Sequence, residues 1–241
     1  IPEMLAGAPD LEGATQQKRK LAAFTPEDRS GRYVHYGVRE HAMGSMLNGM
    51  AAHGGVVPSG VTYLVFSDYE RPAFRLAAMM GLPCLFAFTH DSIGIGRNGP
   101  THQPVEYLAG LRAIPNLLVF RPADAVEAAE CWELAIANRT GPSCLVFARQ
   151  PQEAVRREAG ANRCAQGAYV LAEAKGTRAA TILATGTEVA LAMQARTLLA
   201  AERDPLQPVD DPCRTAKLSQ WRYGVAVGDE AGWTGFLPDG S

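Results

Sequence analysis

Short apolar runs alternate with segments of helical spacing along the first part of the chain, and this alternation constrains the fold more than any other feature. Residues 61–66 and 82–88 have the composition of buried strands, and residues 69–80 between them have the spacing of a helix. We expect Pro72 in the first turn of that helix and Gly81 at its end. Strands that alternate with helices run parallel. The sequence therefore predicts an α/β fold, a three-layer parallel sheet with helices on both faces.

The same pattern predicts the remaining elements of a first domain, residues 1–150. The expected elements are strands at 33–36, 117–120 and 143–147, and helices at 39–52, 105–114 and 123–138. In a parallel sheet of this kind, ligands bind outside the carboxyl ends of the strands. We therefore expect functional residues in the loops that follow the strands.

Three further ranges follow the first domain. Residues 151–166 are rich in Arg, Glu, Gln and Gly without periodicity, and are interpreted as a linker. Residues 167–202 are interpreted as the start of a second α/β domain, with a strand at 179–184 and a helix after Thr185-Gly186-Thr187-Glu188. Residues 203–241 contain four prolines and little periodicity, so we expect an irregular tail there.

Composition and charge argue against several classes of protein. The 241 residues are 47% hydrophobic, which is enough for a sizeable core, and their formal net charge is −2. This balance provides no basic surface for nucleic acid, and no run of about twenty apolar residues predicts a membrane span. The five cysteines form no CxxC pair, as expected in a reducing, cytoplasmic compartment.

The loop at residues 89–106, THDSIGIGRNGPTHQPVE, has a composition that no core requires. It contains three glycines, two prolines and the histidines His90 and His102. Glycine lets the backbone approach a ligand closely, successive N–H groups can form an anion-binding nest, and imidazole groups exchange protons near neutral pH. We interpret this segment as a ligand-binding or catalytic loop.

Nearly every position of this loop resembles the signature of the transketolase family. These thiamine-diphosphate enzymes move two-carbon ketol units between sugar phosphates. A second segment with the family pattern is HYGVREHAMG at residues 35–44, and the similarity runs from about Asp10 to Gln150, then more weakly to about Glu202. The resemblance implies the pyrimidine-binding domain of a transferase of carbohydrate metabolism, in the pentose phosphate pathway, followed by the start of its carboxyl-terminal domain.

Glu40, in the second segment, is the first candidate for catalysis. A glutamate in the first turn of a helix is often only a solvated charge that favours the helix end. Glu40, however, lies between Arg39 and His41 and precedes an apolar helix face, so partial burial is expected. Burial favours the protonated form of a carboxyl group. By resemblance, Glu40 hydrogen-bonds the pyrimidine ring of thiamine diphosphate and activates the cofactor.

Four further residues are candidates for contact with the cofactor. Tyr63, Phe66 and Tyr69 have a spacing that is typical of core packing. By resemblance they surround the pyrimidine ring, with Phe66 as the best match. Asp10 has the setting of a turn or helix-cap residue. By resemblance it lies near the cofactor at a subunit boundary.

The candidate substrate-binding residues are His90, Asn98, His102 and Arg149. An imidazole beside a developing alkoxide can transfer a proton, and by resemblance His90 contacts the sugar phosphate while His102 contacts a hydroxyl or carbonyl oxygen. Both histidines are therefore also candidates for catalysis. Arg149 follows a predicted strand, where a guanidinium suits bidentate phosphate recognition; a salt bridge to the linker is the alternative. We expect no metal ligands in this chain, because no carboxylate or third histidine lies at ligand spacing.

Three features depart from the family pattern. Arg97 and Asn98 stand where the family has Glu-Asp, which puts the sugar preference in doubt because the aspartate reads a substrate hydroxyl. Ala14 stands where the family has a phosphate-binding serine, with Thr15 beside it. The sequence also lacks the Gly-Asp-Gly motif that holds the diphosphate and Mg²⁺ in the family. The resemblance thus implies that this chain binds only the pyrimidine end of thiamine diphosphate, with Mg²⁺ on a separate domain.

The expected partners are sugar phosphates and either a second copy of the chain or a subunit with the diphosphate-binding domain, without which the chain is expected to be inactive. Dihydroxyacetone synthase remains an alternative; deoxyxylulose-phosphate synthase usually lacks the His90-Asp91-Ser92 run. A non-catalytic remnant or interaction module is a further alternative. The last alternative is an α/β domain that binds another phosphate ligand. The presence of Glu40 argues against it, because phosphate binding alone requires no such glutamate.

Overall fold

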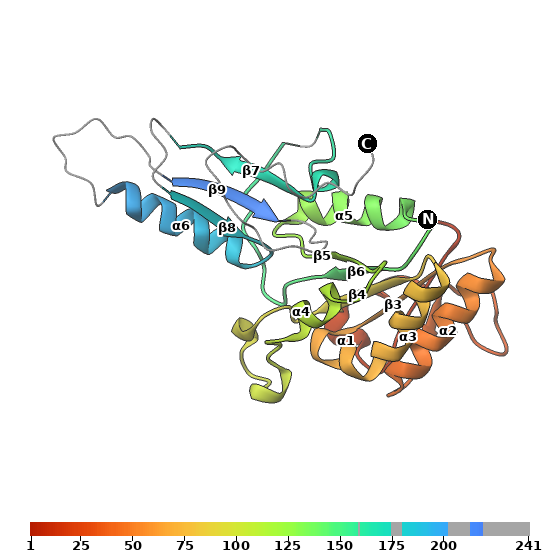
Figure 1. Ribbon diagram of the computed structural model, residues 1–241. Coiled ribbons are helices and arrows are strands. Elements are labelled where there is room, and N and C mark those ends of the chain that lie inside the picture. Colours follow the sequence, from red (N-terminus) through yellow and green to blue (C-terminus); the bar gives the residue numbers. More distant parts are fainter. Residues whose placement is uncertain (159, 175–179, 202–212, 219–241) are drawn as a thin grey trace.

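The computed structural model describes residues 1–158, 160–174, 180–201 and 213–218. A six-stranded parallel sheet lies at the centre of the first 150 residues, in the order β2-β1-β3-β4-β6-β5 (Figure 1). Every neighbouring pair in this sheet is parallel, which confirms the predicted α/β architecture. The strands are β1 (Met4–Ala8), β2 (Tyr33–His35), β3 (Val57–Tyr63), β4 (Leu85–Thr89), β5 (Leu118–Phe120) and β6 (Ser143–Val146).

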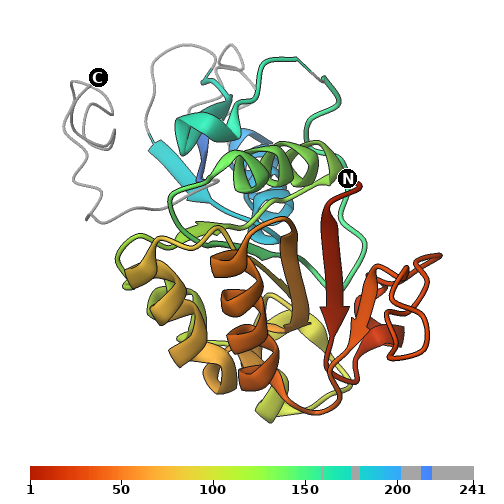
Figure 2. The same ribbon diagram turned by 90° about the vertical axis from the view of Figure 1, so that its right-hand side faces the viewer.

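Helices cover both faces of this sheet (Figures 1 and 2). One face carries α2 (Glu40–His53), α3 (Ser67–Met80) and α4 (Tyr107–Arg112), and the other carries α5 (Ala125–Ala137). Phe86 and Phe88 of β4 pack against Phe74 of α3, whereas Leu85 belongs to the core under α5. Successive side chains of a strand point to opposite faces, so a strand covered on both sides is apolar throughout.

The boundaries around β3 and α3 differ from the prediction. The range 61–66 does not form one strand, because the chain turns into a 3-10 helix at Leu64–Phe66 immediately after β3. Helix α3 consequently begins at Ser67, and Pro72 lies inside it rather than in its first turn. Gly81 ends the helix as expected, with φ 67° and its N–H directed to the carbonyls of Ala77 and Ala78.

Strand β1 was not predicted from the sequence. It lies between β2 and β3 and pairs in parallel with both. Its sequence, MLAGA, is short and rich in small residues, so it lacks the β-branched and aromatic composition on which the prediction relied. The four-residue helix α1 (Glu12–Thr15) follows it.

The predicted linker is irregular but is fastened to α5. Oδ2 of Asp124, the N-cap of α5, accepts hydrogen bonds from the N–H groups of Val155 and Arg156. One carboxylate oxygen of Glu130 pairs with the Arg156 guanidinium, and the other accepts from the N–H groups of Arg163 and Cys164. These buried contacts hold the linker against the outer helix of the first sheet.

A second, three-stranded sheet follows, in the order β7-β9-β8. It consists of β7 (Ala168–Ala172), β8 (Ala180–Ala184) and β9 (Cys213–Leu218), and α6 (Glu188–Ala201) follows β8. The sequence predicted β8 and α6 but not β7. Strand β9 pairs in parallel with β8, so the expectation of irregular structure is wrong at residues 213–218; residues 203–212 and 219–241 lie outside the described residues.

Within the described ranges, no helix has both the length and the apolar character that are needed to cross a membrane.

Candidate active site at the carboxyl edge of the sheet

The parallel sheet brings residues from distant parts of the chain to one edge. Asp10 lies two residues beyond β1, Glu40 opens α2 after β2, Tyr63 ends β3, His90 directly follows β4 and Arg149 lies shortly after β6. All these strands run in the same direction, so their carboxyl ends share an edge. Tyr63 and Thr89, the residue before His90, are partners in the β3–β4 register.

Five of the predicted residues form one aromatic cluster at this edge: Tyr63, Phe66, Tyr69, His90 and His102. The rings of Tyr63 and Phe66 stack at 5.6 Å, and that of Tyr63 also stacks on the imidazole of His90 at 3.7 Å. Tyr69 stacks on Phe66 at 5.9 Å, and His102 approaches Phe66 edge-on at 5.5 Å. Tyr69 is 66% exposed, so this cluster is not an ordinary core.

His90 is held in an unusual environment. Its side chain is buried, its backbone has φ 62°, and its Nδ1 lies 2.9 Å from Oγ1 of Thr89. Burial lowers the pKa of His90 to about 4, and the positive charge of Arg149 and the neighbouring His102 add to this effect. The imidazole of His90 is therefore neutral at physiological pH.

We expect the imidazole of His90 to remain neutral as the pH falls towards about 4. An unfolded histidine titrates near about 6.5, so the unfolded state binds the proton first and stability is lost between about pH 6.5 and 4. Histidine ¹⁵N NMR spectra recorded during a titration check this, with His90→Gln to assign the signal. The remaining histidines serve as internal references, and a His90 signal that titrates near about 6.5 contradicts the expectation.

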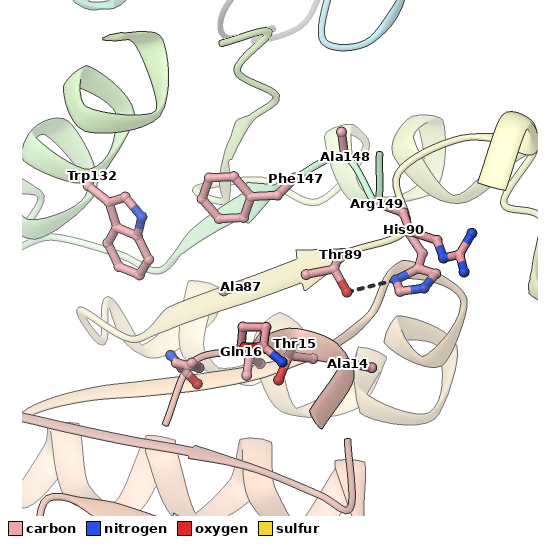
Figure 3. A pocket seen from close by; sticks show the side chains of 12 residues that line it. Ala14, Thr15, Gln16, Ala87, Thr89, His90, Trp132, Phe147, Ala148 and Arg149 are labelled. Carbon is pink, nitrogen blue, oxygen red and sulfur yellow. Dashed lines mark hydrogen bonds between the residues drawn. The ribbon is translucent and has the colours of Figure 1, made fainter. Parts of the chain in front are cut away.

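His90 and Arg149 line a pocket of about 390 Å³ (Figure 3). The opposite wall contains Thr15 and Gln16, next to Ala14 at the position of the family serine. Nη1 of Arg149 donates to the carbonyl of Ile95, 2.5 Å away, so the described partner of this arginine is the glycine-rich loop rather than the linker. The remaining lining residues are Gln17, Val61, Ala87, Thr89, Trp132, Phe147 and Ala148.

Two of the predicted residues, Asn98 and Asp10, belong neither to the aromatic cluster nor to the lining of the pocket. Asn98 is half-buried and its N–H donates to the carbonyl of Gly96, but among the described residues its side chain makes no hydrogen bond to the aromatic cluster. Asp10 is exposed and influences the cluster only at a distance: burial raises the pKa of Tyr63, and the charge of Asp10 adds to that rise. The substituted Arg97 is exposed, with φ 65°.

Glu40 is buried, as predicted, with 8% of its surface exposed. A second carboxyl group, that of Glu70 in α3, is fully buried and was not predicted from the sequence. Burial raises the pKa of Glu70 well above its ordinary value, and the charge of Glu40 raises it further. A signal was present in the sequence: Glu70 lies three and four residues before Ala73 and Phe74, on the apolar stripe of the helix.

A buried ion-pair network behind the loop was also missed. The Nε and Nη2 groups of Arg121, just beyond β5, donate to one oxygen of Asp91 at 3.1 and 2.8 Å. The same guanidinium binds the carbonyl of Thr185, the hydroxyl of Thr187 and the carboxylate of Glu188. Asp91 follows His90 directly. The network therefore joins the glycine-rich loop to the start of the second α/β unit.

Gly186 allows this network to form. It has φ 57°, and a Cβ atom at this position would lie 2.5 Å from Nε of Arg121. The Thr-Gly-Thr-Glu segment was predicted only as the opening of a helix, whereas its side chains and carbonyls also bind the arginine.

Comparison with known proteins connects this geometry to a family. The family model described as "Transketolase, pyrimidine binding domain" matches residues 1–153. The chain belongs to the transketolase family. A second model, described as "DNA utilization proteins HofP", matches residues 186–241, most of which lie outside the described residues.

Curated transketolases are similar over most of this chain. The transketolase of Sinorhizobium medicae is 54% identical over 200 residues, which cover 82% of this chain and 29% of the relative. That of Rhodobacter capsulatus is 49% identical over 215 residues, covering 88% and 32%. The chain thus spans about a third of the length of these transketolases.

Solved structures agree. The transketolase from Leishmania mexicana has a TM-score of 0.82 and 37% identity over 91% of this chain and 32% of that one. A structure described as "Split gene transketolase, inactive beta4 tetramer" has a TM-score of 0.67 and 26% identity, covering 91% of this chain and 66% of that chain.

Proposed function

We propose that this chain is the pyrimidine-binding part of a transketolase that transfers a two-carbon ketol unit between sugar phosphates. The observation that carries the proposal is the placement of a buried Glu40 and the aromatic cluster at the same edge of the sheet. When bound, thiamine diphosphate supplies the nucleophilic carbon that holds the two-carbon unit. This chain contributes groups that bind and orient the cofactor's pyrimidine end and the substrate.

The cofactor end of the site fits a flat heteroaromatic ring. Phe66 and Tyr69 stack on one another, and the ring of Tyr69 is largely exposed at the edge of the sheet. Aromatic rings of this kind bind a pyrimidine by offset stacking. The ring of Tyr63 stacks on the other side chain of this pair, Phe66. Glu40 exchanges a proton with the pyrimidine nitrogen of the cofactor. Asp10 lies near the cofactor at the subunit boundary.

The substrate end combines one charged group with neutral hydrogen-bonding groups. Arg149 supplies positive charge for a sugar phosphate, and His90, being neutral, supplies a hydrogen bond without charge. Thr15 stands in the same pocket, beside Ala14, and offers a hydroxyl in place of the family serine. His102 exchanges a proton with a substrate oxygen, and the amide of Asn98 binds a sugar hydroxyl.

The complete site needs a second part that holds the diphosphate. Within the described residues, no three His, Cys, Asp or Glu side chains lie close enough to bind a metal ion, and we assign Mg²⁺ to the diphosphate-binding domain. The similar structure named as an inactive split-gene tetramer supports the expectation that this part is inactive alone. We propose a cytoplasmic assembly in the pentose phosphate pathway, with a second copy of the chain or with a separate subunit that carries the diphosphate-binding domain.

We expect turnover only after complementation. The chain is mixed with the diphosphate-binding part of the Sinorhizobium medicae transketolase, and ketol transfer from xylulose 5-phosphate to ribose 5-phosphate is measured. Activity should require both parts, thiamine diphosphate and Mg²⁺, because the cofactor is held between domains. A chain with Glu40→Gln, which should lose activity, is the negative control. A complemented assembly that neither binds thiamine diphosphate nor turns over contradicts the proposal.

Because Arg97 and Asn98 differ from the family pattern, dihydroxyacetone synthase activity is tested as an alternative in the same assay. These residues replace two acidic side chains in the loop that leads to His102, so the acceptor sugar can differ from that of other transketolases. If formaldehyde is a better acceptor than ribose 5-phosphate, the enzyme is a dihydroxyacetone synthase. A chain that folds and dimerises but is never complemented is a non-catalytic interaction module.

A further inference from the structure

Helices α2 and α3 approach each other closely at Gly44. A Cβ atom at this position would lie 2.7 Å from Cβ of Ala73 and 2.8 Å from both Cγ and Oε1 of Glu70. Gly44 lies four residues after Glu40, so the two positions share one side of α2, one turn apart. The Glu70 carboxyl group is therefore packed against the backbone of α2 at Gly44, one turn away from Glu40.

This carboxyl group is buried without compensation. Neither oxygen of Glu70 has a hydrogen-bond partner among the described residues, and the residue is 0% exposed. Glu40 is the only charged group in the described chain whose field shifts the pKa of Glu70, and it raises that pKa. A buried carboxylate with no cation and no donor is strongly disfavoured, so the group retains its proton instead.

Among the described residues, the other titratable groups that interact with Glu70 provide no positive charge. Tyr36 precedes α2, Cys84 precedes β4 and Cys144 lies in β6; all three are buried. Burial raises the pKa of Tyr36 and of Cys84 to about 12 and that of Cys144 well above its ordinary value, and in each case a charge on Glu70 would add to the rise. All three remain neutral at physiological pH.

We propose that Glu70 is held as a neutral carboxylic acid one turn of α2 away from Glu40, so that it places no second negative charge beside Glu40 at the α2–α3 contact. Two carboxyl groups in one buried site do not readily ionise together. Glu70 is thus a positioning residue that acts through Glu40. The protonation of Glu70 is a property of the chain without cofactor, whereas its effect on catalysis rests on the function proposed for Glu40.

Infrared spectroscopy of the 241-residue chain at neutral pH locates the proton. The carbonyl stretch of a protonated carboxylic acid is expected in the wild type and in Glu40→Gln, and should be lost in Glu70→Gln and in Glu70→Leu. The leucine variant is included in case the buried amide of Glu70→Gln prevents folding. Glu27→Gln, at an exposed site, is the control. A band that is absent from the wild type, or that disappears in Glu40→Gln and persists in Glu70→Gln, overturns the proposal.

The pH dependence of stability provides a second readout. A carboxyl group in the unfolded chain loses its proton near about pH 4.3, whereas Glu70 in the folded chain keeps it to higher pH. Between those two values the folded state binds more protons, so stability falls as the pH rises. In this window, the ratio of the folding equilibrium constant of Glu70→Gln to that of the wild type should increase by about tenfold per pH unit. Urea denaturation at a series of pH values measures this ratio. A pH-independent difference overturns the proposal.

The role toward Glu40 is tested in the complemented enzyme. Ionisation of Glu70 at alkaline pH would oppose the negative charge on Glu40, so Glu70→Gln should move the alkaline limb of the pH–rate profile to higher pH. A variant profile identical to that of the wild type overturns the link to Glu40. Absence of thiamine diphosphate-dependent turnover in the wild type contradicts the proposed function instead, and the infrared result then stands by itself.

Discussion

Replacement of Glu40 with glutamine lowers the turnover of the complemented enzyme by about 10²- to 10⁴-fold. Glutamine preserves the shape of the side chain but cannot exchange a proton with the pyrimidine nitrogen of the cofactor. Glu40 is buried at the start of α2, so water does not readily replace the missing acid. The measurement is steady-state ketol transfer at saturating thiamine diphosphate, which separates loss of turnover from weaker cofactor binding.

The matched control for this prediction is Glu27→Gln. Glu27 is exposed in the loop before β2 and is not among the residues that line the pocket, so the same chemical change there should leave turnover unaltered. Equal turnover in Glu40→Gln and the wild type would remove Glu40 from the mechanism. Recovery of the lost activity by excess cofactor would reduce its role to binding.

Replacement of Arg121 with alanine destabilises the chain by about 3–5 kcal/mol. Arg121 and Asp91 are 5% and 2% exposed, and the substitution leaves the Asp91 carboxylate buried without its cation. Glu188 contributes less to this cost, because its side chain is 48% exposed and water solvates it when the arginine is absent. Urea denaturation followed by circular dichroism measures the difference.

Two variants sharpen this prediction. Arg139→Ala removes an exposed arginine and should change stability by no more than about 0.5 kcal/mol. Adding Asp91→Asn to Arg121→Ala should recover part of the loss, because the neutral amide is less costly to leave buried than a carboxylate. A loss below about 1 kcal/mol for Arg121→Ala would show that the network contributes little to folding.

The alternation of apolar runs and helical spacing was sufficient to predict the parallel sheet, since periodicity is a local property of the chain. It located β4 and α5 to within a few residues, because long or continuously apolar segments have few alternatives. It failed at β1 and β7, each of which has two alanines among its five residues, and at the position of Pro72. In these places pairing with neighbouring strands, or an added 3-10 turn, outweighs local preference.

The candidate site, too, was predicted in part from the sequence and in part only described by the structure. Because parallel strands share a carboxyl edge, the order of the elements was enough to predict that Glu40 and the loop with His90 lie at the same edge of the sheet. The spacing of Tyr63, Phe66 and Tyr69 did not distinguish a core from a binding surface. In the structure Tyr63 is buried and stacks on His90, whereas Tyr69 is 66% exposed, so the three rings do not form one closed core.

By itself, the sequence determined the α/β architecture, the edge that carries the site and the resemblance to transketolases, because these depend on periodicity and on contiguous motifs. Only the tertiary structure decided the charge state of His90, the burial of Glu70 and the partners of Arg121. The ion pair of Arg121 with Asp91 joins residues 30 positions apart, and its bond to Thr187 joins residues 66 apart. Burial and pairing of this kind depend on which elements pack together, and no local pattern encodes that.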